Sequence, residues 1–287
     1  SVIGCGTKDT KEQDAYRQYG ITCMESGKYE DAVKAFQNAL GESIGHIGEK
    51  ELDICFYKAK AQALDGKTKD ALATYDAIIK YNKDARAYYL RGDLYMDMGE
   101  EKKGRADFES AVQHGKKNYE IYIGIYESLS RHEKKDEGQK YLSAAMEIKG
   151  DKPEDELYKG RISYLLGENK DAISYLEKAK EHKQMLASYY LGLAYDANGD
   201  SDKAKKCIAE YIKSGVATSY DLYELGMQEM QDGNYKNALT YFNSGLELEK
   251  VPNKQNLMKS AIAAYEYSGD FDSAKKMIKE YLKAYPD

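Results

Sequence analysis

Apolar residues recur at three- and four-residue spacing on both sides of Gly233, a pattern that predicts two amphipathic helices over residues 220–248. The glycine suits the turn between them, because a residue without a Cβ adopts a positive φ without a steric clash. A hairpin of this length cannot bury two apolar stripes by itself, so it needs neighbours of its own kind. The stripes consist of Leu222, Leu225, Gly226 and Met230 before the turn, and of Ala238, Leu239, Phe242, Gly245 and Leu246 after it.

The same pattern returns along the chain at intervals of 32 to 39 residues. The residue five positions after each turn is always small, and the residue nine positions after it is always large and apolar. The residue seven positions before the turn is small except at Tyr126 and Ile262. A non-glycine residue in the left-handed region costs about 1 kcal/mol, so we expect the turn at Glu133 to adopt another shape. The eight turn residues are Gly27, Gly66, Gly99, Glu133, Gly167, Gly199, Gly233 and Gly269.

Residues 41–48 form the longest connection between two hairpins. Its three glycines do not make a phosphate-binding loop, because no predicted strand precedes them and Glu51 follows Lys50 where a hydroxyl would be needed. We therefore expect an inter-repeat loop, with Ile44 and Ile47 tucked beneath it.

This register resembles the tetratricopeptide repeat family, whose 34-residue helix-turn-helix unit has small residues at the helix crossings and a closing proline. Pro286 stands once in the closing position. The family's early tryptophan is absent, and Tyr88, Tyr122, Leu222 and others take its place. The resemblance implies an all-α fold, an α-solenoid of about eight helix-turn-helix repeats that form a right-handed superhelix. The repeats are expected near residues 13–46, 52–84, 85–118, 119–152, 153–184, 185–218, 219–252 and 255–287.

The composition suits such an array, because 42% hydrophobic and 32% charged residues fit thin core layers with much surface. The net charge of −6 is spread along the chain and makes no basic stripe, which argues against nucleic acid as a partner. The four cysteines show no C-x-x-C pairing, so neither a zinc site nor a disulfide framework is indicated. Cys23, Cys55 and Cys207 are interpreted as small buried hydrophobes. We expect no metal and no cofactor.

The first cysteine belongs to a different pattern. Residues 1–5, SVIGC, precede a polar stretch and resemble the end of a bacterial lipoprotein signal. The motif predicts a lipid on Cys5, a tether over residues 1–11 and an array over 12–287 held outside the cytoplasm, with the lipid as its membrane contact. The alternative is a chance V-I-G-C sequence in a cytoplasmic protein. No apolar run approaches the ~20 residues of a transmembrane helix.

The sequence offers no catalytic constellation. The histidines fall in predicted loops or helix ends of different repeats and share no helical face with a serine, cysteine or carboxylate. We interpret all four as solvated surface residues. The carboxylates alternate with lysines, as on solvated helix faces. We therefore expect no catalytic residue and no enzymatic activity. The histidines are His46, His114, His132 and His182.

In the family that the chain resembles, the first helices of the repeats line a concave groove that holds peptides. Residues ten, six and three positions before each turn share one helical face. The candidate residues for this groove are Phe56, Lys60, Tyr89, Asp93, Met96, Glu127, Arg161, Tyr164, Tyr189, Leu193, Tyr223, Met227 and Met230, with Tyr220 beside them. The middle of this face is charged, whereas repeats six and seven carry tyrosine and methionine, which suit binding because tyrosine is rigid and methionine adapts its shape. The alternative is that these side chains pack between helices.

These patterns predict a non-catalytic scaffold that binds a peptide or a partner protein's segment in the groove. The carboxylate clamp of chaperone-binding members is not reproduced at the groove positions, which argues against a chaperone adaptor. Two alternatives remain open: a small-molecule or glycan binding protein that uses the tyrosine-lined groove, and a cytoplasmic assembly or regulatory factor. The oligomeric state is not predicted.

Overall fold

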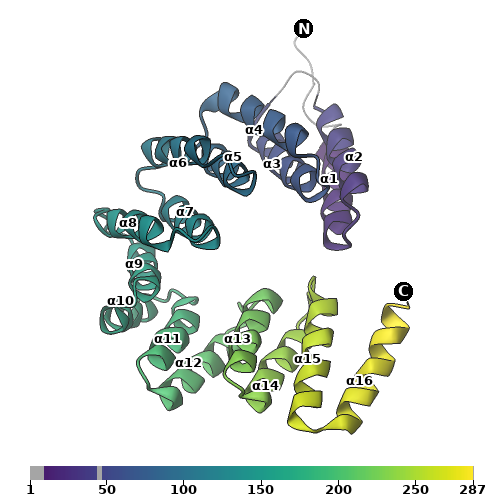
Figure 1. The fold of residues 1–287 in the computed structure, drawn as a ribbon, viewed down its shortest axis with the longest axis vertical. Helices are drawn as coiled ribbons and strands as arrows, with labels where there is room; N and C mark the ends of the chain where they lie inside the picture. The colour runs from purple at the N-terminus through teal and green to yellow at the C-terminus, as the bar shows by residue number, and fades with distance from the viewer. Residues whose placement is uncertain (1–9, 44–46, 287) are drawn as a thin grey trace. The chain divides into compact units, whose positions relative to one another are not determined.

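The computed structural model describes residues 10–43 and 47–286, so Cys5, Ile44 and His46 lie outside the described residues. Within the described part the chain forms sixteen α-helices and no strand. Consecutive helices pair as hairpins, and within each of two units neighbouring hairpins stack, which makes the fold an all-α solenoid (Figure 1). Of these helices, none combines the length and the apolar character needed to span a bilayer.

Contacts within the chain group the hairpins into two compact units, divided between Lys152 and Pro153. The single array over 12–287 stays a prediction. The helices of the first unit are α1 Thr10–Glu25, α2 Tyr29–Gly41, α3 Glu49–Leu64, α4 Thr68–Asn82, α5 Ala85–Asp97, α6 Glu101–His114, α7 Tyr119–Arg131 and α8 Lys135–Met146. Those of the second unit are α9 Pro153–Leu165, α10 Asn169–Glu181, α11 Ala187–Ala197, α12 Ser201–Lys213, α13 Ser219–Gln231, α14 Tyr235–Leu246, α15 Lys254–Ser268 and α16 Phe271–Ala284.

The turns inside the hairpins share one backbone conformation. Seven of them place a glycine in the left-handed region, with φ between 74° and 89°. Glu133 occupies the eighth with φ of 62°, so the prediction of a different shape is wrong. Its turn keeps the bonds of the glycine turns: Lys134 N–H donates to the Leu129 carbonyl at 2.8 Å, as Lys28 N–H does to Cys23. These bonds hold Glu133 against a conformational cost of about 1 kcal/mol.

Within a hairpin, a small residue of the first helix lies against a large residue of the second. A Cβ built on Gly226 would lie 2.3 Å from the fully buried ring of Phe242. The positions seven before and nine after the turn are therefore in contact, which explains why a small and a large residue recur together. Tyr126, an exception to this rule, is accommodated differently. Gly138 replaces the usual alanine beside it, at a place where a Cβ would lie 3.1 Å from the tyrosine ring.

A buried carboxylate organises the connection before α3. Glu51 accepts hydrogen bonds from the Gly48 backbone N–H at 2.8 Å and from Ser43 Oγ at 2.7 Å. Ile47 is 51% exposed, so the prediction that it tucks beneath the connection is wrong. Its carbonyl accepts a bond from the Tyr81 hydroxyl at 2.9 Å. Polar bonds therefore hold the described ends of this connection in place.

The interface between the hairpins α11–α12 and α13–α14 is wider than its neighbours. The backbones of α12 and α13 approach less closely than those of α10 and α11, or of α14 and α15. Large side chains fill this interval, among them Tyr189, Ile208, Tyr211, Leu222 and Leu225. Their bulk separates the two hairpins and leaves room for a crevice beside them.

Candidate interaction site

A crevice of about 220 Å³ opens in the second unit between these two hairpins. All four helices contribute to it, and its lining mixes apolar side chains with carboxylates and amides. The lining residues are Gly192, Leu193, Asp196, Ser201, Ala204, Lys205, Ile208, Leu225, Gln228, Glu229, Asn234, Asn237 and Tyr241. We refer to this set as the unit 2 crevice.

The charges of the unit 2 crevice are mostly negative. Asp196 comes from α11 and Glu229 from α13, while Lys205 of α12 is the cation in the lining. Burial raises the pKa of the Tyr241 hydroxyl to about 12, with help from the charges of Glu229 and Asp196. Asn237 donates a long hydrogen bond of 3.5 Å to Glu229. The crevice therefore offers a neutral phenol and several amides beside two carboxylates.

One of the groove residues predicted in the second unit lines this crevice, and several others pack against a neighbouring core cluster. Leu193 lines it directly, and Tyr223, Met227 and Met230 pack half-buried against the cluster around Phe242. Tyr220 is 54% exposed at the start of α13. The two interpretations, binding in a groove and packing between helices, are thus compatible for the half-buried side chains. Each packs on a neighbour and still presents part of its surface to solvent.

Other predicted groove residues of the second unit lie deeper or farther away. Tyr189 is only 9% exposed, and its ring centroid lies 5.2 Å from that of Tyr211. Tyr164 and Arg161 are half-buried, and the Arg161 guanidinium lies 4.9 Å from the centre of the Tyr190 ring. Tyr189 therefore acts in packing, and Arg161 is engaged with aromatic side chains of its own unit.

In the first unit the predicted groove residues divide into core and surface. Phe56 and Met96 are buried, and Met96 is only 2% exposed because its sulfur fills the space beside Gly104, where a Cβ would lie 2.7 Å away. Tyr89 and Asp93 are half-buried, and burial raises the pKa of the Tyr89 hydroxyl. The exposed members are Lys60 and Glu127. The surface that these residues offer to a partner is therefore polar.

Comparison with known proteins identifies the family of these repeats. A tetratricopeptide repeat model matches residues 58–119, and a second model of the same repeat matches 186–214 and 255–287. The chain is a tetratricopeptide repeat protein. A tetratricopeptide repeat protein from Parabacteroides merdae is similar in structure, with a TM-score of 0.50 and 12% identity over 88% of this chain and 99% of that one. PilW, described as a widely conserved type IV pilus biogenesis factor, has a TM-score of 0.47 and 17% identity over 70% and 94%. No curated protein matches significantly.

The sequence analysis missed Gln228, Glu229, Asn234, Asn237 and Tyr241. It selected one face of the first helix in each tetratricopeptide repeat, whereas the unit 2 crevice lies between two repeats and also uses second helices. A signal was nevertheless present. One position after the turn every other repeat carries a charged residue, and four positions after it every other repeat carries a charged residue or a serine. Repeat seven alone has amides, Asn234 and Asn237, at both positions.

Cys23 and Cys207 of this tetratricopeptide repeat protein are buried as predicted, whereas Cys55 is only half-buried. The thiols of Cys55 and Cys207 are poor nucleophiles. Burial raises the pKa of both Cys55 and Cys207, which keeps the thiols protonated at neutral pH. His182 pairs with Glu156 at 2.6 Å, and the ring of exposed His114 stacks on Tyr88. The remaining described histidine, His132, is half-buried between two hairpins, which differs from the solvated position that we predicted.

Proposed function

We propose that this protein is a non-catalytic interaction scaffold that binds an extended segment of a partner protein at the unit 2 crevice and the adjoining surface of α13. The family supports the general role, since tetratricopeptide repeats mediate protein interactions. The observation that carries the specific proposal is the crevice itself. It places amides and carboxylates beside partly exposed Leu193.

This combination suits a peptide, because a peptide presents backbone donors and acceptors together with side chains. Each amide of Asn234, Asn237 and Gln228 has one acceptor oxygen and two N–H donors, and can pair with either kind of backbone group. Tyr223 and Met227 then supply apolar contacts whose shape adapts to the bound side chains. The amides fix the direction of the segment, and the apolar contacts provide most of its affinity.

The test begins with capture of the partner from detergent-solubilised membranes of the source cell, followed by affinity measurements with peptides that tile the captured protein. We expect Leu193→Ala and the double variant Asn234→Ala with Asn237→Ala each to weaken the best peptide by about tenfold or more. The matched control changes Lys236 and Thr240 to alanine; both are exposed on α14 and outside the crevice lining. Equal affinity for crevice and control variants would contradict this site.

We also propose that Cys5 carries lipid and tethers the scaffold outside the cytoplasm. The support is the SVIGC motif and the polar stretch after it. Labelling the protein in a bacterium with an alkyne-tagged fatty acid should give a signal that Cys5→Ser abolishes and Cys23→Ser leaves intact. A signal that survives Cys5→Ser, or no signal from the unchanged protein, contradicts the anchor.

A further inference from the structure

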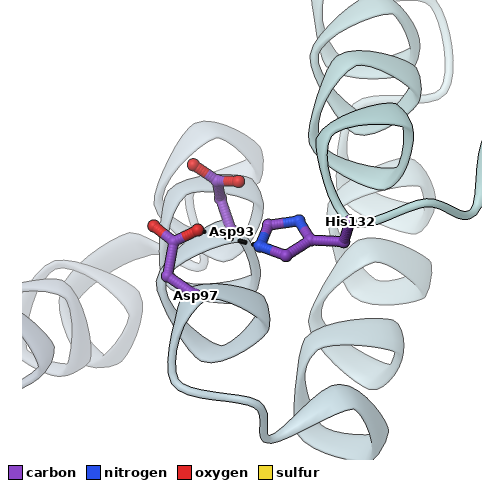
Figure 2. Close-up of side chains that lie close together, drawn as sticks. All are labelled: Asp93, Asp97 and His132. Atoms are coloured by element: carbon purple, nitrogen blue, oxygen red, sulfur yellow. Dashed lines mark ion pairs between the residues drawn. The ribbon is translucent and has the colours of Figure 1, made fainter.

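Two aspartates and a histidine meet between α5 and α7 in the first unit (Figure 2). Asp93 and Asp97 lie one turn apart on α5, and His132 follows the last residue of α7. One ligand atom from each of the three residues lies within 4.8 Å of the others. His132 Nε2 lies 2.9 Å from Asp97 Oδ1. The cluster joins two neighbouring hairpins and is separate from the unit 2 crevice.

The imidazole is oriented by its other nitrogen. His132 Nδ1 lies 2.7 Å from the backbone carbonyl oxygen of Ser128. A carbonyl only accepts, so Nδ1 carries a proton in this contact, and Nε2, which lies 2.9 Å from an Asp97 oxygen, is the nitrogen on which a metal ion would take the place of a proton. Metal-binding histidines in proteins are typically held by such a bond from the nitrogen that does not bind the metal.

Asp93 is held in a similar way. Its Oδ1 accepts one bond from Ser128 Oγ and one from Arg131 Nη2, each at 2.5 Å. Both bonds end on the same oxygen, so Oδ2 is the oxygen that an ion in the cluster would meet. Arg131 also balances one of the two carboxylate charges. With an ion in place of the proton on Nε2, the two carboxylates and Arg131 leave one net negative charge to balance the cation.

We propose that Asp93, Asp97 and His132 form a binding site for a divalent transition-metal ion of the Zn²⁺ type. One imidazole nitrogen with carboxylate oxygens suits Zn²⁺ and similar ions, whereas Ca²⁺ and Mg²⁺ prefer oxygen ligands alone. Three protein ligands leave a position for water. Ligand atoms about 2.1 Å from a tetrahedral ion lie about 3.4 Å apart, so the 2.9 Å between His132 Nε2 and Asp97 Oδ1 must widen slightly, and any pair of ligand atoms farther apart than this must close. The exposed Asp97 side chain can make this movement.

An ion in this site would connect α5 and α7 and so stabilise the packing of the two hairpins. It would replace the direct contact between His132 and Asp97 with two bonds to a shared centre. The competing explanation is that the cluster is only an ion pair between a protonated His132 and Asp97, with no affinity for metals. Metal titration separates the two explanations.

The experiment is calorimetric titration of the full chain, freed of metals by a chelator, with ZnCl₂ at neutral pH. We expect one Zn²⁺ per chain at this site and a higher melting temperature in the presence of the ion. His132→Gln and Asp97→Asn should each weaken binding by about tenfold or more, and Ser128→Ala by about 10- to 100-fold through the lost support of Asp93. CaCl₂ and MgCl₂ should bind far more weakly than ZnCl₂.

The matched control is His182→Gln, which removes an exposed histidine that is also paired with a carboxylate but lies outside the cluster. It should bind Zn²⁺ like the unchanged protein. The helical circular dichroism of each variant establishes that it folds. The proposal is overturned if the unchanged chain takes up no Zn²⁺, if Ca²⁺ or Mg²⁺ binds as tightly, or if His132→Gln and Asp97→Asn bind Zn²⁺ as well as the control does.

Discussion

At the scale of single residues, some side chains have structural roles that their positions in the repeat do not predict. Glu51 is a first-turn glutamate of α3, a place where acidic residues are common on helix surfaces. It is nevertheless buried and accepts bonds from Gly48, Ser43 and Gln13. The carboxylate thereby joins α1, the end of the α2 hairpin and α3.

The pH dependence of this contribution has a definite sign. Burial alone would raise the pKa of Glu51, but the bonds from Ser43, the backbone and Gln13 prevail and lower it to about 2. A carboxyl with a depressed pKa stabilises the fold above its unfolded pKa of about 4.3, and the stabilisation is lost as pH falls toward about 2. We expect Glu51→Gln to lower the free energy of unfolding by about 2 kcal/mol near pH 7.

Urea unfolding at about pH 7 and about pH 3 checks this expectation. The difference between Glu51→Gln and the unchanged protein should shrink at the lower pH. Glu49→Gln is the control, because Glu49 lies in the same first turn of α3 but is exposed. A difference that stays constant with pH would show that the charge of Glu51 is not what stabilises the connection.

A second residue-scale prediction concerns Gly226. A Cβ here would lie 2.3 Å from the Phe242 ring, so Gly226→Ala should overpack the hairpin and destabilise it by about 1–3 kcal/mol. Phe242→Leu should relieve part of this cost in the double variant, and a double-mutant cycle measures the coupling. Gly41→Ala is the control, because no atom lies within 4 Å of a Cβ there. An equal effect at both glycines would contradict the close contact.

At the scale of elements, a single arginine connects three helices. Arg91 of α5 makes two bonds of 2.8 Å to Asp107 of α6 and one of 2.8 Å to Asp76 of α4. Asp107 is only 5% exposed, and the Arg91 guanidinium also lies within 6 Å of the ring centres of Tyr88 and Tyr95. The pair of Arg91 and Asp107 therefore joins the two helices of hairpin three, and the bond to Asp76 joins hairpin three to hairpin two.

Breaking this pair on one side should be costly. Asp107→Leu leaves a largely desolvated guanidinium without its main partner, and we expect a loss of about 3–5 kcal/mol in the free energy of unfolding. The double variant Arg91→Met with Asp107→Leu removes both charges and should recover much of the loss. Asp76→Ala, at the more exposed end of the network, should cost about 1 kcal/mol or less. Chemical denaturation of all three variants gives the comparison, and a double variant as unstable as Asp107→Leu would contradict the ion-pair explanation.

At the scale of the whole molecule, each of the two units has core clusters of its own. The first unit packs around Phe36, Tyr75 and Phe108, and the second around Leu176 and Phe242, among other residues. In a repeat array, stability is approximately a sum of repeat and nearest-neighbour terms. Damage to one unit should therefore stay largely inside it.

Hydrogen exchange of the Gly226→Ala variant tests this expectation. Amides of α13 and α14 should exchange faster, the effect should fade toward α11 and α16, and amides of α1 to α7 should keep their protection. A uniform increase over all sixteen helices would show instead that the described chain unfolds as one cooperative body.

Much of this architecture follows from the sequence alone, because its determinants are local. A 3.6-residue apolar period and a turn residue that tolerates positive φ are visible in any single repeat, and they specify each hairpin. The small residue at Gly226 and the large one at Phe242 also belong to one hairpin, so their pairing appears as a fixed spacing. The seven turn glycines were expected in the left-handed region, and the structure confirms this conformation for all seven.

Only the tertiary structure decided which surfaces remain open and which charges meet. The unit 2 crevice depends on how far Tyr189 and Tyr211 separate two hairpins, and that distance is a property of packed side chains. In the proposed metal site, likewise, His132 follows Asp97 by 35 positions and Asp93 by 39 positions in the sequence. The stacking of repeats determines which of these residues become neighbours. Periodicity predicts that the repeats stack, but it does not predict the distances between hairpins, because their packing depends on every side chain at the interface.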